Sequence, residues 1–220
     1  MQKIIVSEEL KEKIPSLQLS CIECDVKMIP LHKELWNLIE DKVNSLSTSM
    51  KIEEISRIPA IAASRKGYKA CGKDPARYRL SAEALLRRVV NRNEIYQINN
   101  VVDLLNLVSI STGFSIGGYD AGKIEGDAVF GIGKVNEPYE GIGRGELNIE
   151  GMPVFRDSKG AFGTPTSDSV RTSVTLETSR FLMIIIDYGT PDTLKEATSM
   201  AENLLKNYAW AKNIEIKTIK

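Results

Sequence analysis

Histidine and cysteine are scarce in this 220-residue chain, which has one histidine, His32, and three cysteines. Three cysteines cannot build a disulfide scaffold. Cys21 and Cys24 have the Cys-x-x-Cys spacing, but they lie in 17–29, which the pattern predicts as a strand, where residues three apart face opposite sides. A Ser-His-Asp or Cys-His site would have to use His32, which opens an amphipathic segment without a nucleophile nearby. We therefore interpret His32 as a surface residue, expect no metal and no cofactor, and expect any hydrolysis to proceed without histidine.

Long apolar runs are also absent, and none approaches the roughly 20 residues that span a bilayer. The amino-terminal residues turn acidic after three apolar ones, unlike a signal peptide. We expect a cytoplasmic protein. Repeats and domain linkers are missing as well, so the sequence predicts one domain over 1–220. Within it, 1–56 is expected to hold strands and a helix, and 189–220 a helix and a short strand.

Charge is balanced overall but distributed unevenly. The formal net charge is zero, yet segment 57–92 holds ten cations against only Asp74 and Glu83. Such a segment is expected where a protein meets phosphate, and Tyr68 and Tyr78 within it can stack on bases. An ordinary solvated face is the alternative. The segment contains no Walker A motif. The candidate RNA-binding residues are Arg65, Lys66, Lys69, Lys73, Arg77, Arg79, Arg87 and Arg88.

The stretch 98–120 begins as a predicted helix and ends as a glycine-rich turn. Asn100 is expected to cap the helix, with Asp103 at the third helical position, as in a capping box. Gly113 is expected to end the helix. Asn106 interrupts the apolar run and needs partners if it is buried. Gly117-Gly118 is predicted to be a loop whose bare backbone can approach a ligand closely, so the stretch indicates a pocket for a small polar group.

The second half of the chain is predicted to be rich in strands. A hairpin is expected at 147–156 around Glu150-Gly151. Segment 141–145 only superficially resembles a dinucleotide loop, because no strand precedes it and no helix follows. The hydroxyl-rich segment 160–172 is predicted to be a loop that offers donors. Glu177 falls in a long predicted strand region, 173–187, where it either is buried with a partner or lies on the wet face.

These motifs together resemble a known family. Ile98-Asn-Asn-Val-Val-Asp with Asn106, then Gly113, Tyr119-Asp120 and Ile124-x-Gly126, closely resembles the editing (B-three/B-four) domain of the phenylalanyl-tRNA synthetase beta subunit. The match continues in order through the motifs Glu150-Gly151, Gly163-Thr-Pro, Thr172 and Val174-Thr-Leu-Glu177. It spans about 57–188, so the chain looks like a free-standing version of that domain.

The resemblance implies an α+β fold with a β-barrel-like core flanked by helices. In the synthetase this domain hydrolyses phenylalanine-specific tRNA that has been mischarged with tyrosine. Glu177 matches the glutamate that recognises the noncognate side chain, and Asn106 matches a pocket asparagine. Gly117 stands at the position of the family histidine, and Leu105 at that of a threonine. These departures imply a roomier pocket, and no synthetase activity is expected.

Two hypotheses follow for the function. The first is an editing-type hydrolase that deacylates misacylated tRNA in trans, with Glu177 as the candidate catalytic residue. The second is a non-catalytic module that binds tRNA or a free amino acid. Under either hypothesis the expected partner is aminoacylated tRNA. Binding to DNA or to a membrane is not expected. The candidate substrate-binding residues are Asn100, Asp103, Asn106, Gly117, Gly118, Tyr119, Gly163, Thr164, Thr166, Ser167, Asp168 and Thr172.

Overall fold

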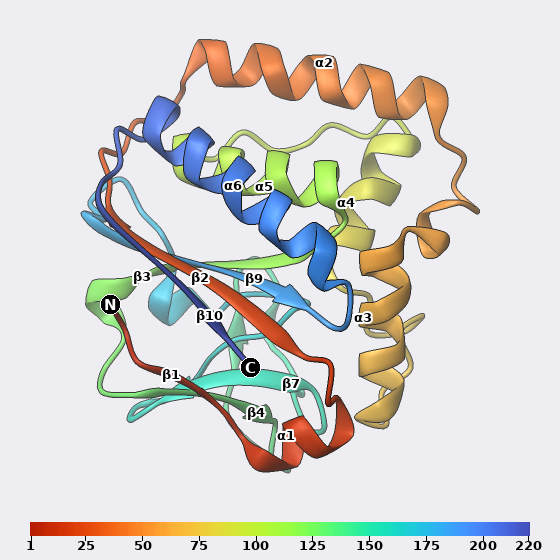
Figure 1. Ribbon diagram of the computed structural model, residues 1–220, viewed down its shortest axis with the longest axis vertical. Helices are drawn as coiled ribbons and strands as arrows, with labels where there is room; N and C mark the ends of the chain where they lie inside the picture. Colours follow the sequence, from red (N-terminus) through yellow and green to blue (C-terminus); the bar gives the residue numbers. More distant parts are fainter.

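A central antiparallel sheet separates a helical layer from a second sheet (Figure 1). The computed structural model describes residues 1–220. The central sheet consists, in order, of β10 (Lys212–Ile219), β2 (Gln18–Asp25), β9 (Arg180–Asp187) and β3 (Ser115–Asp120). The second sheet consists of β1 (Ile4–Val6), β4 (Ala128–Ile132), β7 (Pro153–Asp157) and β8 (Gly160–Gly163). A small hairpin is formed by β5 (Glu140–Gly141) and β6 (Gly145–Glu146).

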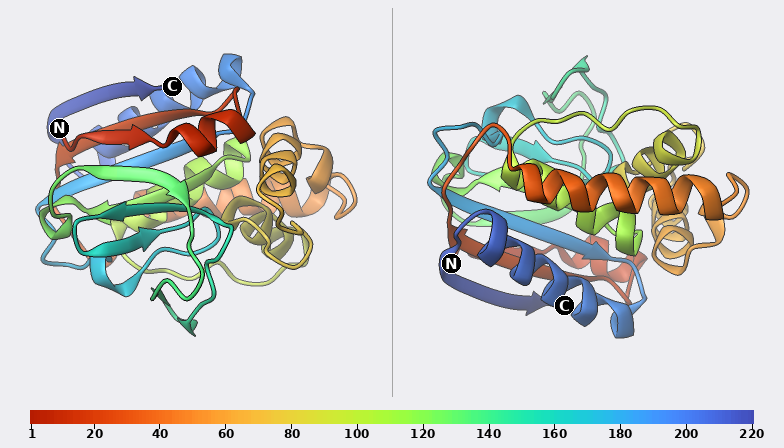
Figure 2. Two further views of the ribbon diagram at one scale, coloured as in Figure 1. Left: turned by 90° about the horizontal axis from the view of Figure 1, so that it is seen from below. Right: turned by 90° about the horizontal axis from the view of Figure 1, so that it is seen from above.

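The helices gather mainly on the face of the central sheet that points away from the second sheet, as the views in Figure 2 also show. They are α1 (Glu8–Lys13), α2 (Lys33–Ser49), α3 (Pro59–Ala70), α4 (Ser81–Val90), α5 (Asn100–Thr112) and α6 (Pro191–Tyr208). Short 3-10 turns lie at η1 (Ile55–Arg57), η2 (Ala121–Lys123) and η3 (Val170–Thr172). Helix α5 is buried along nearly its whole length, because α2, α4, α6 and the sheet surround it. None of these helices is long and apolar enough to cross a membrane.

Two separate apolar cores lie on the two faces of the central sheet. Alternate residues of β9 point into each of them: Phe181 into the core beneath the helices, Leu182 into the core between the sheets. Burial on both faces explains why β9 reads as a near-continuous apolar run. The apolar residues of β2 also occupy both faces, since Ile22 enters the first core and Leu19 the second, and β2 pairs with β9 without a register shift. Cys24 and Cys21 enter opposite cores, which confirms that they do not form a pair.

Local signals located some helix ends. Gly113 ends α5 with a left-handed backbone, as predicted. Ser7 Oγ accepts from the Leu10 N–H at the start of α1. Helix α4 begins at Ser81 without a side-chain cap, and segment 94–98 between α4 and α5 has no regular structure.

The α+β class is confirmed, but the strands form two open four-stranded sheets rather than a closed barrel. The hairpin expected around Glu150-Gly151 is also wrong. These residues form a turn between β6 and β7, and the hairpin of this region joins β7 to β8 through the turn 157–160. Sequence patterns mark turns, but the pairing of strands depends on contacts between distant segments.

Candidate functional site

Two neighbouring cavities with shared wall residues lie beside α4. The smaller, of about 310 Å³, is named the Tyr78 cavity after one of its wall residues. The other, of about 500 Å³, is named the Asn106 cavity. They share Ala84, Arg144 and Thr166, and together they are called the arginine groove. Its cations are Arg77, Arg79, Arg87, Arg88 and Arg144, and no aspartate or glutamate lines it. A concave surface with charge of one sign attracts anions such as phosphate.

Glu83 organises the arginines from beneath the groove. Its side chain is only 1% exposed, and its carboxylate lies 2.8 Å from Arg65 Nη1 and 3.0 Å from Arg87 Nε. Arg79 Nε lies 3.9 Å from the same carboxylate. Positions 79, 83 and 87 are four apart, so α4 and the turn before it place both arginines beside Glu83. Glu83 thus holds Arg79 and Arg87 in position, with both side chains still partly exposed to the groove.

The other predicted RNA-binding residues are distributed more widely. Arg65 belongs to the Glu83 cluster, whereas Lys66 and Lys69 are exposed on α3, and none of the three lines the groove. Lys73 Nζ lies 5.1 Å from the centre of the Tyr78 ring. Arg88 lies 4.3 Å from the centre of the Tyr96 ring. Four of the eight predicted cations therefore line the groove.

Arg144 was missed by reasoning from the sequence, although it lines both cavities. It lies in the turn between β5 and β6, in the glycine-rich segment 141–145. Gly143 and Gly145 adopt positive φ angles of 67° and 68°, which glycine tolerates and which allow this tight turn. The only signal in the sequence was an arginine among glycines. Whether Arg144 reaches the groove depends on where the β5–β6 hairpin packs.

The start of α5 is a structural junction and not part of the groove. Asn99, not Asn100, is the helix cap and accepts from the Val102 N–H. The buried Asn100 side chain accepts from Ile29 N–H and donates to the carbonyls of Lys27 and Tyr208. Asn100 therefore does not have the predicted capping role and does not line the groove. Its side chain instead connects the start of α5 to segment 27–29 and to the end of α6.

Asp103 has a similar role. Its carboxylate accepts from Trp36 Nε1 at 2.7 Å and from the Ile98 N–H at 3.0 Å. Burial raises the pKa of Asp103, while these two donors oppose the rise. By contrast, Asn106 is partly exposed and lines the Asn106 cavity together with Arg87 and Thr166. Of the three candidate residues on α5, only Asn106 faces the groove.

Gly117 and Gly118 lie in strand β3, so the predicted glycine loop is wrong. A Cβ atom on Gly117 would lie 2.2 Å from Tyr119 Oη, and one on Gly118 would lie 2.6 Å from Leu105 Cδ1. A Cβ on Gly163 would also lie 2.2 Å from Tyr119 Oη. These glycines therefore make room for neighbouring side chains. The space expected at Gly117 is filled by the Tyr119 ring.

A buried polar centre lies next to these glycines. Asp168 Oδ2 accepts from the Gly118 N–H at 3.3 Å, whereas Asp168 Oδ1 and the Tyr119 hydroxyl are buried without a partner of normal geometry. Burial raises the pKa of Asp168 to about 7, against the opposing effect of the Tyr119 hydroxyl and the Gly118 N–H. Asp168 is thus a buried carboxyl with a raised pKa, and it does not line the groove.

The segment 164–167 forms a tight turn that the Thr164 hydroxyl holds together. Thr164 Oγ1 accepts from the backbone N–H groups of Thr166 and Ser167, and it donates to the Ser167 carbonyl. Thr166 Oγ1 lies 2.9 Å from the hydroxyl of the buried Tyr68. Thr164 and Thr166 line the groove, whereas Ser167 does not. Thr172 is buried and donates to the Phe162 carbonyl, so it also lies outside the groove.

Glu177 is exposed in a turn and does not line the groove. The strand predicted over 173–187 begins only at Arg180. Before it, Thr178 Oγ1 donates to Asp120 Oδ2 and ties this turn to the end of β3. The predicted convergence therefore holds in part: Asn106 and Thr166 meet in one cavity, and Glu177 is not there.

His32 is less exposed than expected. It precedes α2 and packs edge-on against Tyr208, with the ring centres 5.0 Å apart. Its Nδ1 is buried without a partner. No group of histidine, cysteine and acidic side chains is arranged to hold a metal ion.

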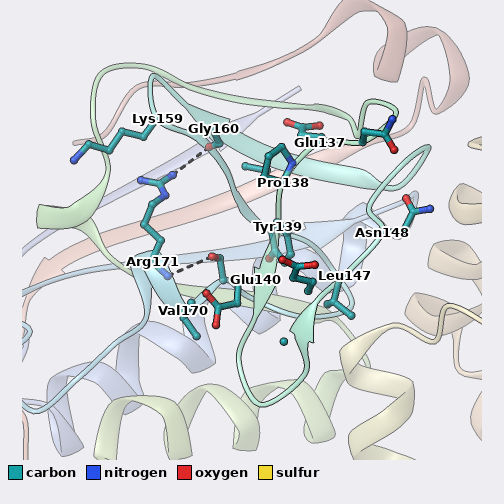
Figure 3. A pocket seen from close by; sticks show the side chains of 15 residues that line it. Glu137, Pro138, Tyr139, Glu140, Leu147, Asn148, Lys159, Gly160, Val170 and Arg171 are labelled. Carbon is teal, nitrogen blue, oxygen red and sulfur yellow. Dashed lines mark hydrogen bonds between the residues drawn. The ribbon is translucent and has the colours of Figure 1, made fainter.

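A larger cavity, of about 1080 Å³, lies elsewhere, between the β5–β6 hairpin and the segment that leads into η3 (Figure 3). Its charged walls are mixed and largely paired. Arg171 binds Asp157, and Glu137 binds Arg156. None of the predicted substrate-binding residues lines it. The arginine groove therefore remains the stronger candidate for a functional site.

Comparisons with known proteins agree with this fold. Residues 63–208 match the model of the B3/4 domain. The N-terminal fragment of the phenylalanyl-tRNA synthetase beta-subunit from Pyrococcus horikoshii has a similar structure, with a TM-score of 0.52 and 15% sequence identity. That likeness covers 99% of this chain but 54% of the other, so the chain spans about half its length. No curated protein matches the chain. Because the family model covers more than half of the residues, the chain belongs to the B3/4 domain family.

Proposed function

We propose that this B3/4 domain binds the acceptor end of aminoacylated tRNA in the arginine groove and hydrolyses the ester of misacylated tRNA in trans. One observation carries the proposal. Asn106, the residue that matches the pocket asparagine of the editing domains, lines a cavity with Arg87, Arg88 and Arg144. The cavity thus offers a polar amide beside cations that suit phosphate.

Hydrolysis of the ester needs a water molecule, a polarised carbonyl and a stabilised leaving hydroxyl. Water adds to the carbonyl carbon, the bond to the ribose oxygen breaks, and that oxygen takes up a proton to leave as the tRNA hydroxyl. The Asn106 amide and the Thr166 hydroxyl are two of the neutral donors on the wall of the Asn106 cavity. Aligned donors and a positioned water molecule accelerate such a step without a covalent nucleophile.

A non-catalytic module that binds tRNA or an amino acid is the second candidate, and two observations favour it. Glu177 is exposed outside the groove. Gly117 stands at the position of the family histidine, and Tyr119 fills the space beside it. The two candidates share the groove and differ only in turnover.

Deacylation of a panel of mischarged tRNAs separates the two candidates. We expect turnover above the blank for at least one aminoacyl group, with a loss of about tenfold or more in Asn106→Ala, since preorganised donors contribute on this scale. Asn37→Ala is the matched control, because Asn37 is exposed on α2. Absence of turnover across the panel refutes the hydrolase. Full activity of Glu177→Ala would remove Glu177 from the mechanism.

The RNA-binding role is tested separately by the salt dependence of tRNA affinity. Arg144→Gln should weaken binding and reduce the slope of log K against log salt by about 0.7–0.9 per lost phosphate contact. Arg57→Gln is the control with the same charge change, because Arg57 is exposed and does not line the groove. Equal effects of the two substitutions would show that only net charge matters and that the groove is not the binding site.

A further inference from the structure

Strand β10 is an open edge of the central sheet. Its eight residues pair with β2 on one side only, and its other side has no backbone hydrogen bond within the chain. It runs along the rim of the molecule in both views of Figure 2. The opposite edge strand, β3, is partly covered, because the Gly118 N–H donates to Asp168 Oδ2. Since the unpaired N–H and C=O groups of an open edge are a template for one more strand, the central sheet can accept a strand at β10.

The side chains of β10 differ between its two faces. Ile216 lies opposite Ile22, a residue of the core beneath the helices, and is itself 43% exposed. Lys217 lies opposite Cys21, a residue of the core between the sheets. Because side chains alternate along a strand, Glu215 shares the face of Lys217. The edge thus presents an uncovered apolar side chain on one face and two opposite charges on the other.

These charges are complementary to those of a second copy of the same strand. Two copies of β10 can pair antiparallel about a two-fold axis perpendicular to the sheet, and residues opposite each other then share a face. An axis through Ile216 places Ile216 against its own copy, and Glu215 of each copy against Lys217 of the other. An axis through Glu215 or Lys217 would set like charges directly opposite, which is destabilising. An axis through Ile214 would pair Glu215 with Asn213, in the irregular part of the strand.

We propose that β10 is the docking edge for a second copy of this chain, and that the two central sheets join antiparallel about Ile216 into one continuous sheet. The pairing covers 214–218, because the strand is irregular between Lys212 and Glu215, where Asn213 has a φ of 49°. Pairing of an edge with its own copy is closed, so it gives a dimer and not a filament. Helix α4 packs on β3, at the other end of the sheet, so both arginine grooves stay open. The dimer and the proposed function therefore stand or fall separately.

Glu215 can accept the new contact and keep its present partners. Its carboxylate lies 2.7 Å from Arg180 Nη2 and 3.1 Å from the amino-terminal nitrogen, and its side chain is still 50% exposed. A carboxylate accepts several hydrogen bonds, so a lysine of the second copy adds to these donors. Lys217 is exposed as well. Both charges are therefore accessible to a second copy.

Sedimentation equilibrium over a range of protein concentrations tests the dimer. The wild type should show a reversible doubling of mass. Lys217→Glu, which leaves the ion pairs of Glu215 intact, should raise the dissociation constant about tenfold or more, because both Glu–Lys contacts become Glu–Glu contacts. Glu215→Lys should have the same effect through two Lys–Lys contacts. Glu40→Lys and Lys51→Glu are the matched controls, since both residues are exposed away from β10, and they should dimerise like the wild type.

A mixture of the two β10 variants tests the register. Glu215→Lys carries two lysines on this face and Lys217→Glu two glutamates, so a mixed pair regains both opposite-charge contacts about Ile216. The mixture should dimerise within a few-fold of the wild type, although each variant alone does not. A mixture of the two control variants has the same net charges and should gain no association.

Four outcomes would overturn the proposal. The wild type may remain monomeric up to about 1 mM, where any dimer is too weak to matter. Full dimerisation by Lys217→Glu would place the interface elsewhere, whatever the fold of Glu215→Lys. Absence of rescue in a mixture of two folded variants would reject the register about Ile216. Equal association in the control mixture would show that net charge alone drives the rescue.

Discussion

Glu83→Gln provides a sharp test of the groove, because two explanations of RNA binding predict opposite signs for it. The substitution raises the formal net charge of the protein from zero to +1. If RNA binding depends only on net charge, affinity should rise. If it depends on where Arg79 and Arg87 are held, affinity should fall, because the carboxylate that positions them is gone.

The magnitude follows from the geometry around Glu83. Its carboxylate is buried and accepts two close charge-assisted hydrogen bonds, from Arg65 and Arg87. Each such bond contributes about 1.5–3 kcal/mol. The arginine side chains are 26% and 29% exposed, so water replaces part of the loss. We expect the free energy of unfolding to fall by about 2 kcal/mol, which corresponds to about 4–8 °C in Tm for a chain of this size.

The loss in affinity has a separate origin. Binding to two arginines that are no longer held requires their ordering on association, at about 0.5–1.5 kcal/mol each. We therefore expect a roughly tenfold weaker affinity for RNA, measured by fluorescence anisotropy well below the Tm of the variant. Glu53→Gln is the matched control, since Glu53 is exposed and has the same charge change. Tighter binding by Glu83→Gln, equal to that of the control, would refute the positioning role of Glu83.

Three further predictions concern the buried groups. Burial raises the pKa of Asp168 to about 7, so the contribution of its protonated form to stability is fully present below about pH 4 and is lost as pH rises towards 7. In urea unfolding, the free energy of unfolding of Asp168→Asn should lack up to about 4 kcal/mol of this change with pH. Parallel pH profiles of stability for the variant and the wild type would contradict the prediction. Gly117→His should lower the free energy of unfolding by at least about 1–3 kcal/mol, because its Cβ would meet the Tyr119 hydroxyl, and an unchanged Tm would refute that contact. Burial raises the pKa of Cys21 and Cys24 to about 12, so iodoacetamide at pH 8 should label them only after unfolding, and rapid labelling of the native protein would contradict their burial.

Patterns of local origin were predicted well from the sequence. The amphipathic segment that follows His32, the helix within 189–220 and the stop at Gly113 depend on residues within a few positions of one another. The α+β class and the family resemblance also follow from ordered local motifs. The glycines of β3 show the limit of this reasoning, since a glycine pair signals a loop and a tightly packed strand alike.

The sequence alone determined which residue types are available to the protein: one histidine, an excess of cations in 57–92, and amphipathic segments of recognisable period. Only the tertiary structure decided which carboxylates are buried and which side chains meet. Glu83 and Asp168 are held by distant partners, whereas Glu177, the acid favoured by its sequence context, lies in solvent. Asn106, Arg144 and Thr166 form one cavity, although their spacing contains no signal of contact. Charge and periodicity are properties of the chain, but burial and convergence depend on how the segments pack.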